Sequence, residues 1–260
     1  MAERTNYAPG TFSWTDLNTT DQDGAKKFYG GLFGWEADDQ PVGDVGMTYS
    51  MMNIGGKPVA GISLQMEMQR QAGAPPAWNS YVTVDSADES ADRAAKLGAN
   101  VIVPPFDVME VGRMAVIQDP QGGFLMLWQP KLHIGASIVN AHGALSWNEL
   151  SSPDTDASAD FYRELFGWQI SPMEGMAMPY LVITTAAGNS NGGIRPPQGP
   201  EPCYWLVYFG TDDIDASLAK STELGGTTLV GSTDIGIGKI AVVRDPQGAV
   251  FALFSGDFEE

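Results

Sequence analysis

The interpretation of this chain depends on two similar stretches: residues 10–35, GTFSWTDLNTTDQDGAKKFYGGLFGW, and residues 143–168, GALSWNELSSPDTDASADFYRELFGW. Aligned without gaps, both contain S-W, a polar residue, an acid and leucine, then an aspartate, and both end in F-Y-x-x-L-F-G-W. Similarity of this kind within one chain indicates a duplication, which must be interpreted before any single motif.

The duplication extends over nearly the whole chain. Trp78 and Trp205, Gly98 and Gly225, and the two D-P-Q-G turns that begin at Asp119 and Asp245 recur at nearly constant offsets. We therefore predict two domains, residues 8–130 and 142–257, joined by a connector at 131–141. Each half is predicted to contain the β-α-β-β-β pattern twice, which makes the chain an α+β protein.

The repeated stretch itself predicts a strand followed by a helix. Residues 12–19 alternate in polarity as a strand does, and Asp21 suits a helix N-cap. In the first copy the apolar residues then recur at helical spacing, and Gly34 suits the left-handed residue that ends a helix. These apolar positions are Ala25, Phe28, Tyr29, Leu32 and Phe33. Residues 66–76 and the connector are predicted to lack regular structure.

The composition excludes several partners and compartments. The 260 residues carry a net charge of −18, which repels nucleic-acid phosphates and anionic lipid. The single cysteine, Cys203, forms no intrachain disulfide and fits a reducing compartment. The N-terminus lacks the apolar segment of a signal peptide, and no apolar run is long enough to span a membrane. We therefore predict a cytoplasmic protein, from an ordinary or a salt-loving source.

The pattern resembles the vicinal oxygen chelate superfamily, which includes glyoxalase I, extradiol dioxygenases and bleomycin-resistance proteins. The resemblance rests on F-Y-x-x-L-F-G-W after the first helix, L-G after the second helix and D-P-Q-G before the last strand. It is closest to the two-domain actinobacterial proteins labelled hydroxylases or glyoxalase-like. It implies that each pair of modules forms a U-shaped sheet with helices outside and the ligand inside.

The resemblance also implies where catalytic members hold a divalent metal, and those positions carry unsuitable residues here. The first ligand position falls on Trp14 and Trp147, the second on Asn79 and Leu206, and the third on Met126 and Ala252. A divalent metal needs imidazole or carboxylate lone pairs, and neither half retains a complete set. Of the two histidines, His133 lies in the connector and His142 directly follows it, and both are predicted to be connector residues with no catalytic part. We predict no metal and no cofactor.

In place of ligands, the residues that the pattern places inside each U are largely apolar or aromatic. They could stack against a planar or aromatic small molecule, or they could simply fill the U as core. The predicted ligand-binding residues are Trp14, Asn79, Tyr81, Phe124, Met126, Trp128, Trp147, Leu206, Tyr208, Ala252 and Phe254.

An acid recurs at the same inward position of both repeats, as Asp16 and Glu149. Poor solvation beside a tryptophan would raise the pKa of such an acid toward the range useful for general acid–base catalysis. These two acids are the predicted catalytic residues. The alternative is a structural acid bonded to neighbouring backbone or to a cation, for which Arg113 and Lys239 are the candidates.

Together these features favour a metal-independent enzyme that acts on a small aromatic or carbonyl compound. A hydroxylase- or isomerase-type or accessory role in secondary metabolism fits the resemblance. The alternatives are a non-catalytic protein that sequesters a small molecule, as bleomycin-resistance members do, and an interaction protein whose clefts are filled. The working unit is expected to be a monomer or a homodimer.

Overall fold

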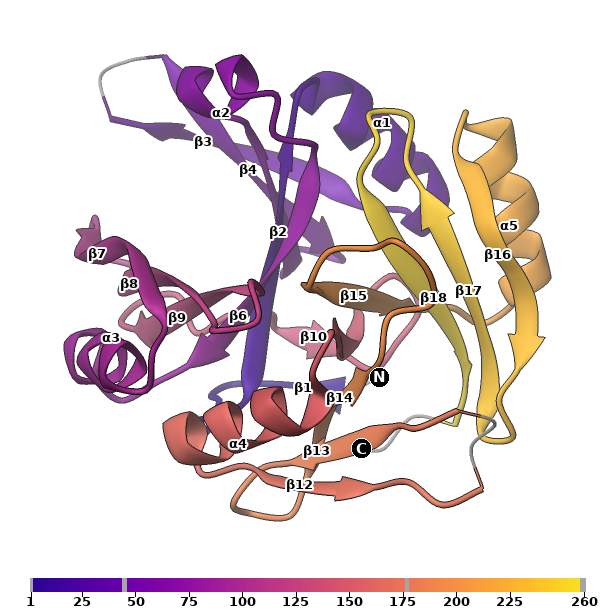
Figure 1. Cartoon of the computed structure of the whole chain (residues 1–260). Helices are drawn as coiled ribbons and strands as arrows, with labels where there is room; N and C mark the ends of the chain where they lie inside the picture. Colours follow the sequence, from indigo (N-terminus) through magenta and orange to yellow (C-terminus); the bar gives the residue numbers. More distant parts are fainter. Residues whose placement is uncertain (1, 44–45, 176–177, 258–260) are drawn as a thin grey trace.

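The computed structural model describes residues 2–43, 46–175 and 178–257, and it confirms an α+β chain built on two curled sheets (Figure 1). The first sheet has eight strands. In order across the sheet they are β3 (Glu36–Val42), β4 (Met47–Ile54), β5 (Lys57–Leu64), β2 (Phe12–Thr19), β6 (Ala77–Thr83), β9 (Phe124–Pro130), β8 (Gly112–Gln118) and β7 (Asn100–Val108).

The second sheet repeats this order strand for strand. The repeated strands are β12 (Gln169–Pro172), β13 (Leu181–Thr184), β14 (Ser190–Arg195), β11 (Leu145–Ser151), β15 (Tyr204–Gly210), β18 (Val250–Gly256), β17 (Gly238–Arg244) and β16 (Thr227–Asp234), and this sheet also contains two short strands outside that order. In both sheets the first strand of each module lies at the centre, where β2 pairs with β6 and β11 pairs with β15. The duplication seen in the sequence is therefore a duplication of topology.

The helix predicted in each repeated stretch is present. Helix α1 (Gln22–Phe33) begins where the Asp21 side chain accepts a hydrogen bond from the Gly24 N–H at 3.0 Å. It ends at Gly34, which has a φ of 71°, a conformation that costs glycine little because it has no Cβ. Helix α4 (Thr155–Phe166) has the same two caps, Asp154 and Gly167. Local chemistry alone specifies these elements.

Two segments predicted to be irregular contain short regular elements. Helix α2 (Glu67–Gln71) lies within residues 66–76, and the Gln69 side chain accepts the Met66 N–H at its start. In the connector, β10 (Ile138–Val139) pairs with β1 (Ala2–Glu3) and with β11. No sequence pattern predicts β10, because a two-residue strand has no periodicity of its own and depends on partners distant in sequence.

The remaining helices pack on the outer faces of the sheets. Helix α3 (Ala87–Lys96) contacts β7, β8 and β9, and α5 (Ile214–Glu223) contacts β16, β17 and β18. Helices α1 and α4 instead lie between the halves: α1 packs beside α5, and α4 packs beside α3 (Figure 1). Each repeated stretch is therefore placed against the other half of the chain.

A reciprocal pattern of hydrogen bonds holds the first helix of each half against the other half. The Tyr29 hydroxyl on α1 donates to Asp245 at 3.0 Å and accepts the Trp78 indole N–H at 2.9 Å. On α4, the Tyr162 hydroxyl donates to Asp119 at 2.7 Å and accepts the N–H of Trp205 at 3.1 Å. Each aspartate belongs to the D-P-Q-G turn of the opposite half.

The two tryptophans that end the repeated stretches also donate hydrogen bonds to the opposite half. The Trp35 indole donates to the Gly143 carbonyl at 2.8 Å, and the Trp168 indole donates to the Gly10 carbonyl at 2.7 Å. Apolar packing follows the same exchange, since Phe28 and Phe33 of α1 lie against Phe251 of β18. The two halves therefore complete each other's hydrophobic cores.

None of the helices in the described part of the chain is both long enough and apolar enough to cross a membrane.

We predict that Tyr29→Phe and Tyr162→Phe will destabilise the fold to a similar extent. Each change leaves a buried indole N–H and a buried carboxylate oxygen without a partner, which costs about 2 kcal/mol. Urea unfolding followed by circular dichroism measures this loss. A loss below about 0.5 kcal/mol for both variants would show that the exchanged bonds do not hold the halves together.

Candidate functional site

Strand alternation gives each sheet an inner and an outer face. On β9, Leu125 and Leu127 pack in the core that contains α4, so Phe124, Met126 and Trp128 point to the opposite, inner side. The register from β2 through β6 to β9 aligns inner-face residues in one row, namely Trp14, Tyr81 and Met126.

We call the first inner face the surface formed by Trp14, Asp16, Asn79, Tyr81, Phe124, Met126 and Trp128. The second inner face is formed by Trp147, Glu149, Leu206, Tyr208, Ala252 and Phe254. The structure thus brings the sequence-predicted site residues of each half onto one surface, where Phe124 is the most exposed at 48%.

Asp16 lies at the centre of a hydrogen-bond network on the first inner face. Its carboxyl group accepts the Asn79 side-chain N–H at 2.8 Å, the Tyr81 hydroxyl at 2.7 Å and the Tyr49 hydroxyl at 3.3 Å. The Trp14 indole in turn donates to the Tyr49 hydroxyl at 2.9 Å. The carboxyl is therefore buried but well supplied with donors.

Burial raises the pKa of the Asp16 carboxyl above its ordinary value, and the hydrogen bonds from Asn79, Tyr81 and Tyr49 only partly offset this. The ion pairs found among residues 2–43, 46–175 and 178–257 do not include Asp16. A carboxyl in this state can carry a proton at a higher pH than a solvated aspartate can.

Sequence reasoning missed Tyr49, which reaches Asp16 from β4 across a glycine. Gly61 on β5 is the register partner of Asp16, and a Cβ placed there would lie 1.9 Å from the Tyr49 hydroxyl. Only a residue without a side chain lets the ring pass over the strand. The sequence signal for this contact was a glycine on the strand that pairs with the acid, together with a tyrosine on the next strand.

The second inner face has the same arrangement. The Trp147 indole donates to the Tyr180 hydroxyl at 2.9 Å, and Tyr180 and Tyr208 both bond the Glu149 carboxyl. Gly193 is the register partner of Glu149, and a Cβ there would lie 2.1 Å from the Tyr180 hydroxyl. The tryptophan, two tyrosines, acid and glycine are thus duplicated as a unit.

A cation distinguishes the second acid from the first. Arg195 Nε donates to Glu149 at 2.7 Å, and Arg195 Nη1 donates to Glu201 at 2.5 Å. Although burial opposes its charge, the bond to Arg195 helps to lower the pKa of Glu201 to about 2. Glu149 and Glu201 therefore share one buried guanidinium, a group that sequence reasoning did not identify.

The cations that the sequence suggested as partners of the two acids lie elsewhere. Arg113 forms an ion pair with Asp88 at 2.7 Å, and Lys239 lies 3.9 Å from Asp215. Arg113 lies on β8 and Lys239 lies on β17. Each is three strands away from the central strand that carries the acid of its own sheet. The suggestion was wrong because equivalent positions in a repeat need not be adjacent in the sheet.

His133 covers the tryptophans of the first inner face. Its ring lies edge-on to Trp14 with centroids 4.5 Å apart, and its carbonyl accepts the Trp128 indole N–H at 3.0 Å. Burial lowers the pKa of His133 to about 4, so the imidazole is uncharged at neutral pH. Its Nε2 is buried and has no hydrogen-bond partner among the residues that the structure describes. The connector thus supplies a side chain to this site, which the sequence did not reveal.

The positions implied for metal ligands do not suit a divalent cation. The Trp14 indole and the Asn79 amide each use their N–H as a donor to the tyrosine–acid network, and Met126 offers only a thioether. Across the described ranges, no group of three His, Cys, Asp or Glu side chains is arranged to hold a metal. We therefore derive no chemistry through a metal.

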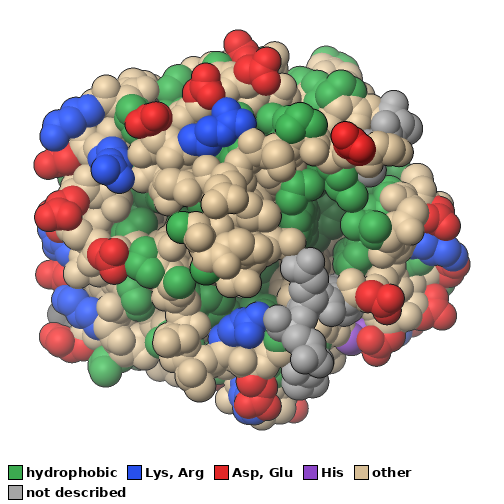
Figure 2. Space-filling view, turned by 90° about the horizontal axis from the view of Figure 1, so that it is seen from below, with side chains coloured by type: hydrophobic (Ala, Val, Ile, Leu, Met, Phe, Trp, Pro, Cys, Tyr) green, Lys and Arg blue, Asp and Glu red, His purple; other side chains and the backbone are tan. Residues whose placement is uncertain are grey.

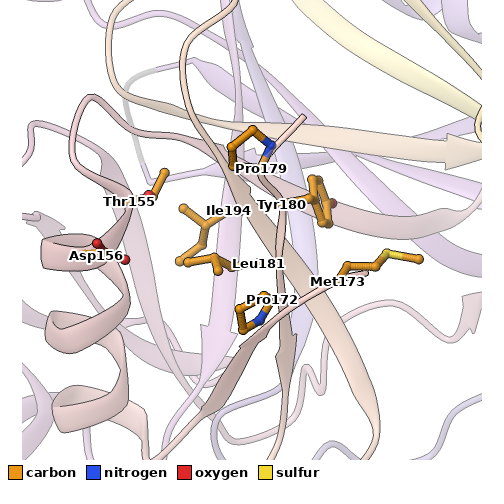
Figure 3. A pocket seen from close by; sticks show the side chains of 8 residues that line it. All are labelled: Thr155, Asp156, Pro172, Met173, Pro179, Tyr180, Leu181 and Ile194. Carbon is orange, nitrogen blue, oxygen red and sulfur yellow. The ribbon is translucent and has the colours of Figure 1, made fainter. Parts of the chain in front are cut away.

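A hollow of about 300 Å³ lies between the first turn of α4 and the edge strands of the second sheet (Figure 3). Its lining contains none of the sequence-predicted site residues; it consists of Thr155, Asp156, Pro172, Met173, Pro179, Tyr180, Leu181 and Ile194. Ile194 belongs to the core beneath α4, so the hollow opens beside the outer face, and only Tyr180 also belongs to the network around Glu149.

Two family models match the chain. Residues 11–127 match the glyoxalase/bleomycin resistance protein/dioxygenase superfamily, and residues 148–254 match a glyoxalase-like domain. Together they cover most of both sheets.

Similar proteins include CFP32 of Mycobacterium tuberculosis, whose name describes it as a candidate glyoxylase. It is 42% identical over 255 residues, which are 97% of this chain and 97% of CFP32. The anthracycline biosynthesis protein DnrV of Streptomyces peucetius is 33% identical over 266 residues, covering 96% of this chain and 94% of DnrV.

Solved structures share the fold at low identity. The Mn(II)-bound glyoxalase from Novosphingobium aromaticivorans has a TM-score of 0.67 at 17% identity, over 97% of this chain and 85% of the other. The 2,3-dioxygenase LapB from Pseudomonas sp. KL28 has a TM-score of 0.66 at 13% identity, over 97% of this chain and 95% of the other.

We predict that Gly61→Ala will disrupt the first inner face. The new methyl group displaces the Tyr49 ring, so Asp16 loses one donor and the fold loses about 1–3 kcal/mol. Gly193→Ala should act in the same way on Tyr180. Thermal unfolding measures both, with Gly231→Ala as the control because that glycine is exposed and has no atom within 4 Å of a built Cβ. Equal stability of all three variants would contradict the close contact.

A second prediction concerns the buried ion pairs. Arg195→Met should cost about 3–5 kcal/mol because it leaves the carboxylates of Glu149 and Glu201 without a cation. The control is Arg70→Met, which removes an exposed pair with Glu67 and should cost less than about 1 kcal/mol. Chemical denaturation of the three proteins compares these costs, and similar values would show that the Arg195 cluster is not effectively buried.

Proposed function

Because this chain belongs to the glyoxalase/bleomycin resistance protein/dioxygenase superfamily, we propose that it is a metal-independent member acting on a small aromatic or carbonyl compound at the first inner face. The names of the similar proteins, a candidate glyoxylase and an anthracycline biosynthesis protein, fit an accessory enzyme of secondary metabolism. We further propose that it works in the cytoplasm as a monomer or homodimer.

The observation that carries this proposal is the buried Asp16 carboxyl, which has hydrogen-bond donors but forms no ion pair with any cation in the described part of the chain. A raised pKa suits general acid–base catalysis, in which Asp16 removes a proton from one atom of the ligand and returns it to another. Such a reaction is an isomerisation, with no net change in protons or electrons. Asn79 and Tyr81 hold the carboxyl in place during both transfers.

The surroundings of Asp16 favour an uncharged ligand. Trp14 and Trp128 make the surroundings of the acid apolar, and both are buried, at 3% and 5% exposed. The net charge of −18 repels an anion approaching this surface. We therefore expect neutral hydroxyketones and aromatic ketones to be better substrates than carboxylates or phosphates.

A second candidate function is binding without turnover. It is favoured by the fact that both oxygens of the Asp16 carboxyl already accept hydrogen bonds, from Asn79, Tyr81 and Tyr49. A carboxyl with these partners can serve as a fixed part of the structure, with the ligand held by the apolar residues above it.

Proton exchange separates the two functions. In D2O the wild-type protein should catalyse deuterium incorporation into a neutral hydroxyketone from a panel that NMR can follow. Asp16→Asn should slow this exchange by about a hundredfold or more, because an amide cannot accept and return the proton. Asp23→Asn is the control, since Asp23 is a solvated acid on α1. If the ligand binds but wild type and Asp16→Asn exchange deuterium at the same rate, proton transfer by Asp16 is contradicted and the binding function remains.

The same variant tests the pKa of Asp16 through stability. A raised folded-state pKa means that Asp16 contributes stability at pH values below the ordinary aspartate pKa and loses it as the pH rises through the folded-state pKa. Asparagine does not titrate. The free energy of unfolding of wild type minus that of Asp16→Asn should therefore fall as the pH rises from about 3 to 8. A difference that stays constant with pH would contradict the shift.

A further inference from the structure

The two repeated stretches differ at the first turn of their helices, and the difference leaves a hollow open beside α4. We propose that this hollow, which Thr155, Asp156, Leu181 and Ile194 help to line, binds a small apolar molecule that carries one cationic amine. The hollow opens beside the outer face of the second sheet, and its lining includes no member of the first or second inner face. The site is therefore separate from the chemistry proposed at Asp16.

In the first half, a glutamine side chain fills the corresponding space. Gln22 is the first residue of α1, and its Nε2 donates to the Ser50 hydroxyl at 3.0 Å and to the Ile62 carbonyl at 2.9 Å. In the gapless alignment of the two stretches, the counterpart of Gln22 is Thr155. Threonine has a shorter side chain and no amide, so it cannot bridge from the helix to the strands in the same way. The space that Gln22 occupies in one half is left open in the other.

The strands across from the helix also become less polar. Ser50 pairs with Ile62 in the first sheet, and Leu181 pairs with Ile194 at the equivalent place in the second sheet. The serine hydroxyl that binds Gln22 is thus replaced by a leucine side chain. Leu181 and Ile194 both pack with the core beneath α4. Thr155 and Asp156 on the helix therefore lie across from an apolar wall (Figure 3).

Asp156 gives the hollow its charge. The counterpart of Asp156 in the first half is Asp23, whose carboxylate pairs with the Lys26 ammonium at 2.9 Å. The position of Lys26 is taken in the second half by Ala159, which is buried. The ion pairs formed within the described part of the chain do not include Asp156. The second half keeps the carboxylate but lacks the ammonium.

The first half also shows that a cation is accepted at this position. The positive end of the helix dipole opposes a cation near a helix N-terminus. The ammonium of Lys26 nevertheless lies beside Asp23 in the first turn of α1, where the carboxylate offsets the dipole. In α4 the carboxylates of Asp154 and Asp156 provide the same compensation.

The size and the surroundings of the hollow define the rest of the ligand. Its volume of about 300 Å³ is at the lower end of the range for ligand pockets, so it suits a single ring with a short chain. The Tyr180 ring also lines it, held in place by the hydrogen bond from Trp147, and an aromatic ring attracts an ammonium group. Figure 2 shows acidic side chains around a hollowed face with hydrophobic walls, and the net charge of −18 favours the approach of a cation.

The test uses 2-phenylethylamine as the probe and NMR titration of the intact, ¹⁵N-labelled chain. We expect the largest shifts at the backbone amides around Thr155 and Asp156. Asp156→Asn should weaken binding by about threefold to fivefold, the range for an exposed ion pair. Thr155→Gln should weaken it by about tenfold or more, because the new amide fills the space that the ring needs.

Matched controls separate the site from general charge effects. Glu164→Gln removes the same charge from an exposed position on α4 outside the hollow and should leave the affinity unchanged. 3-Phenylpropionate has a similar ring and chain but carries an anion, and it should bind far more weakly than the amine. Thermal melts confirm that each variant is folded.

Four outcomes would overturn the proposal. The first is a folded wild type that does not bind the amine at concentrations up to about 10 mM. The second is equal affinity in wild type, Asp156→Asn and Thr155→Gln. The third is a loss in Glu164→Gln as large as that in Asp156→Asn, which would reduce the effect to net charge. The fourth is equal binding of 3-phenylpropionate and the amine.

Discussion

The hydrogen bond from the first helix of each half to the aspartate turn of the other half is the constraint on which the structure depends. In the turn, one oxygen of Asp245 accepts three backbone N–H groups, which leaves the other oxygen for Tyr29. Asp119 holds its own turn and binds Tyr162 in the same way. Because each half supplies the helix that covers the other, the outer faces of the two sheets share their hydrophobic cores.

In each inner face, a glycine on the strand beside the acid allows the hydrogen-bond network to form. Gly61 and Gly193 lie opposite the acids and let Tyr49 and Tyr180 reach across a strand, so that an acid two residues from a tryptophan becomes part of a closed hydrogen-bond network. The unit occurs in both halves, and Arg195 accompanies only the second copy. A single buried cation separates an acid held by neutral hydrogen-bond donors from an acid held in an ion pair, although the two are equivalent in the alignment.

Local signals account for the parts of the fold that were predicted correctly. The N-cap of α1 at Asp21, its apolar stripe and its end at Gly34 are encoded within a few residues, and so is the alternation that sorts Met126 inward and Leu125 outward. The prediction failed where partners are distant. Helix α2 has no conventional cap residue, β10 exists only through its pairing, and Arg113 was assigned to an acid that lies three strands away.

The sequence by itself determined the duplication, the α+β class, the inward positions and the mismatch at the implied metal positions, because repeat spacing, strand periodicity and ligand chemistry are all local properties. Only the tertiary structure decided what surrounds each acid. The pairing of Glu149 with Arg195, the exchange of helices between the halves and the cover that His133 places over Trp14 join residues far apart in the chain. Such contacts form because burial and hydrogen bonding favour them once the chain is compact, and no short stretch of sequence carries that information.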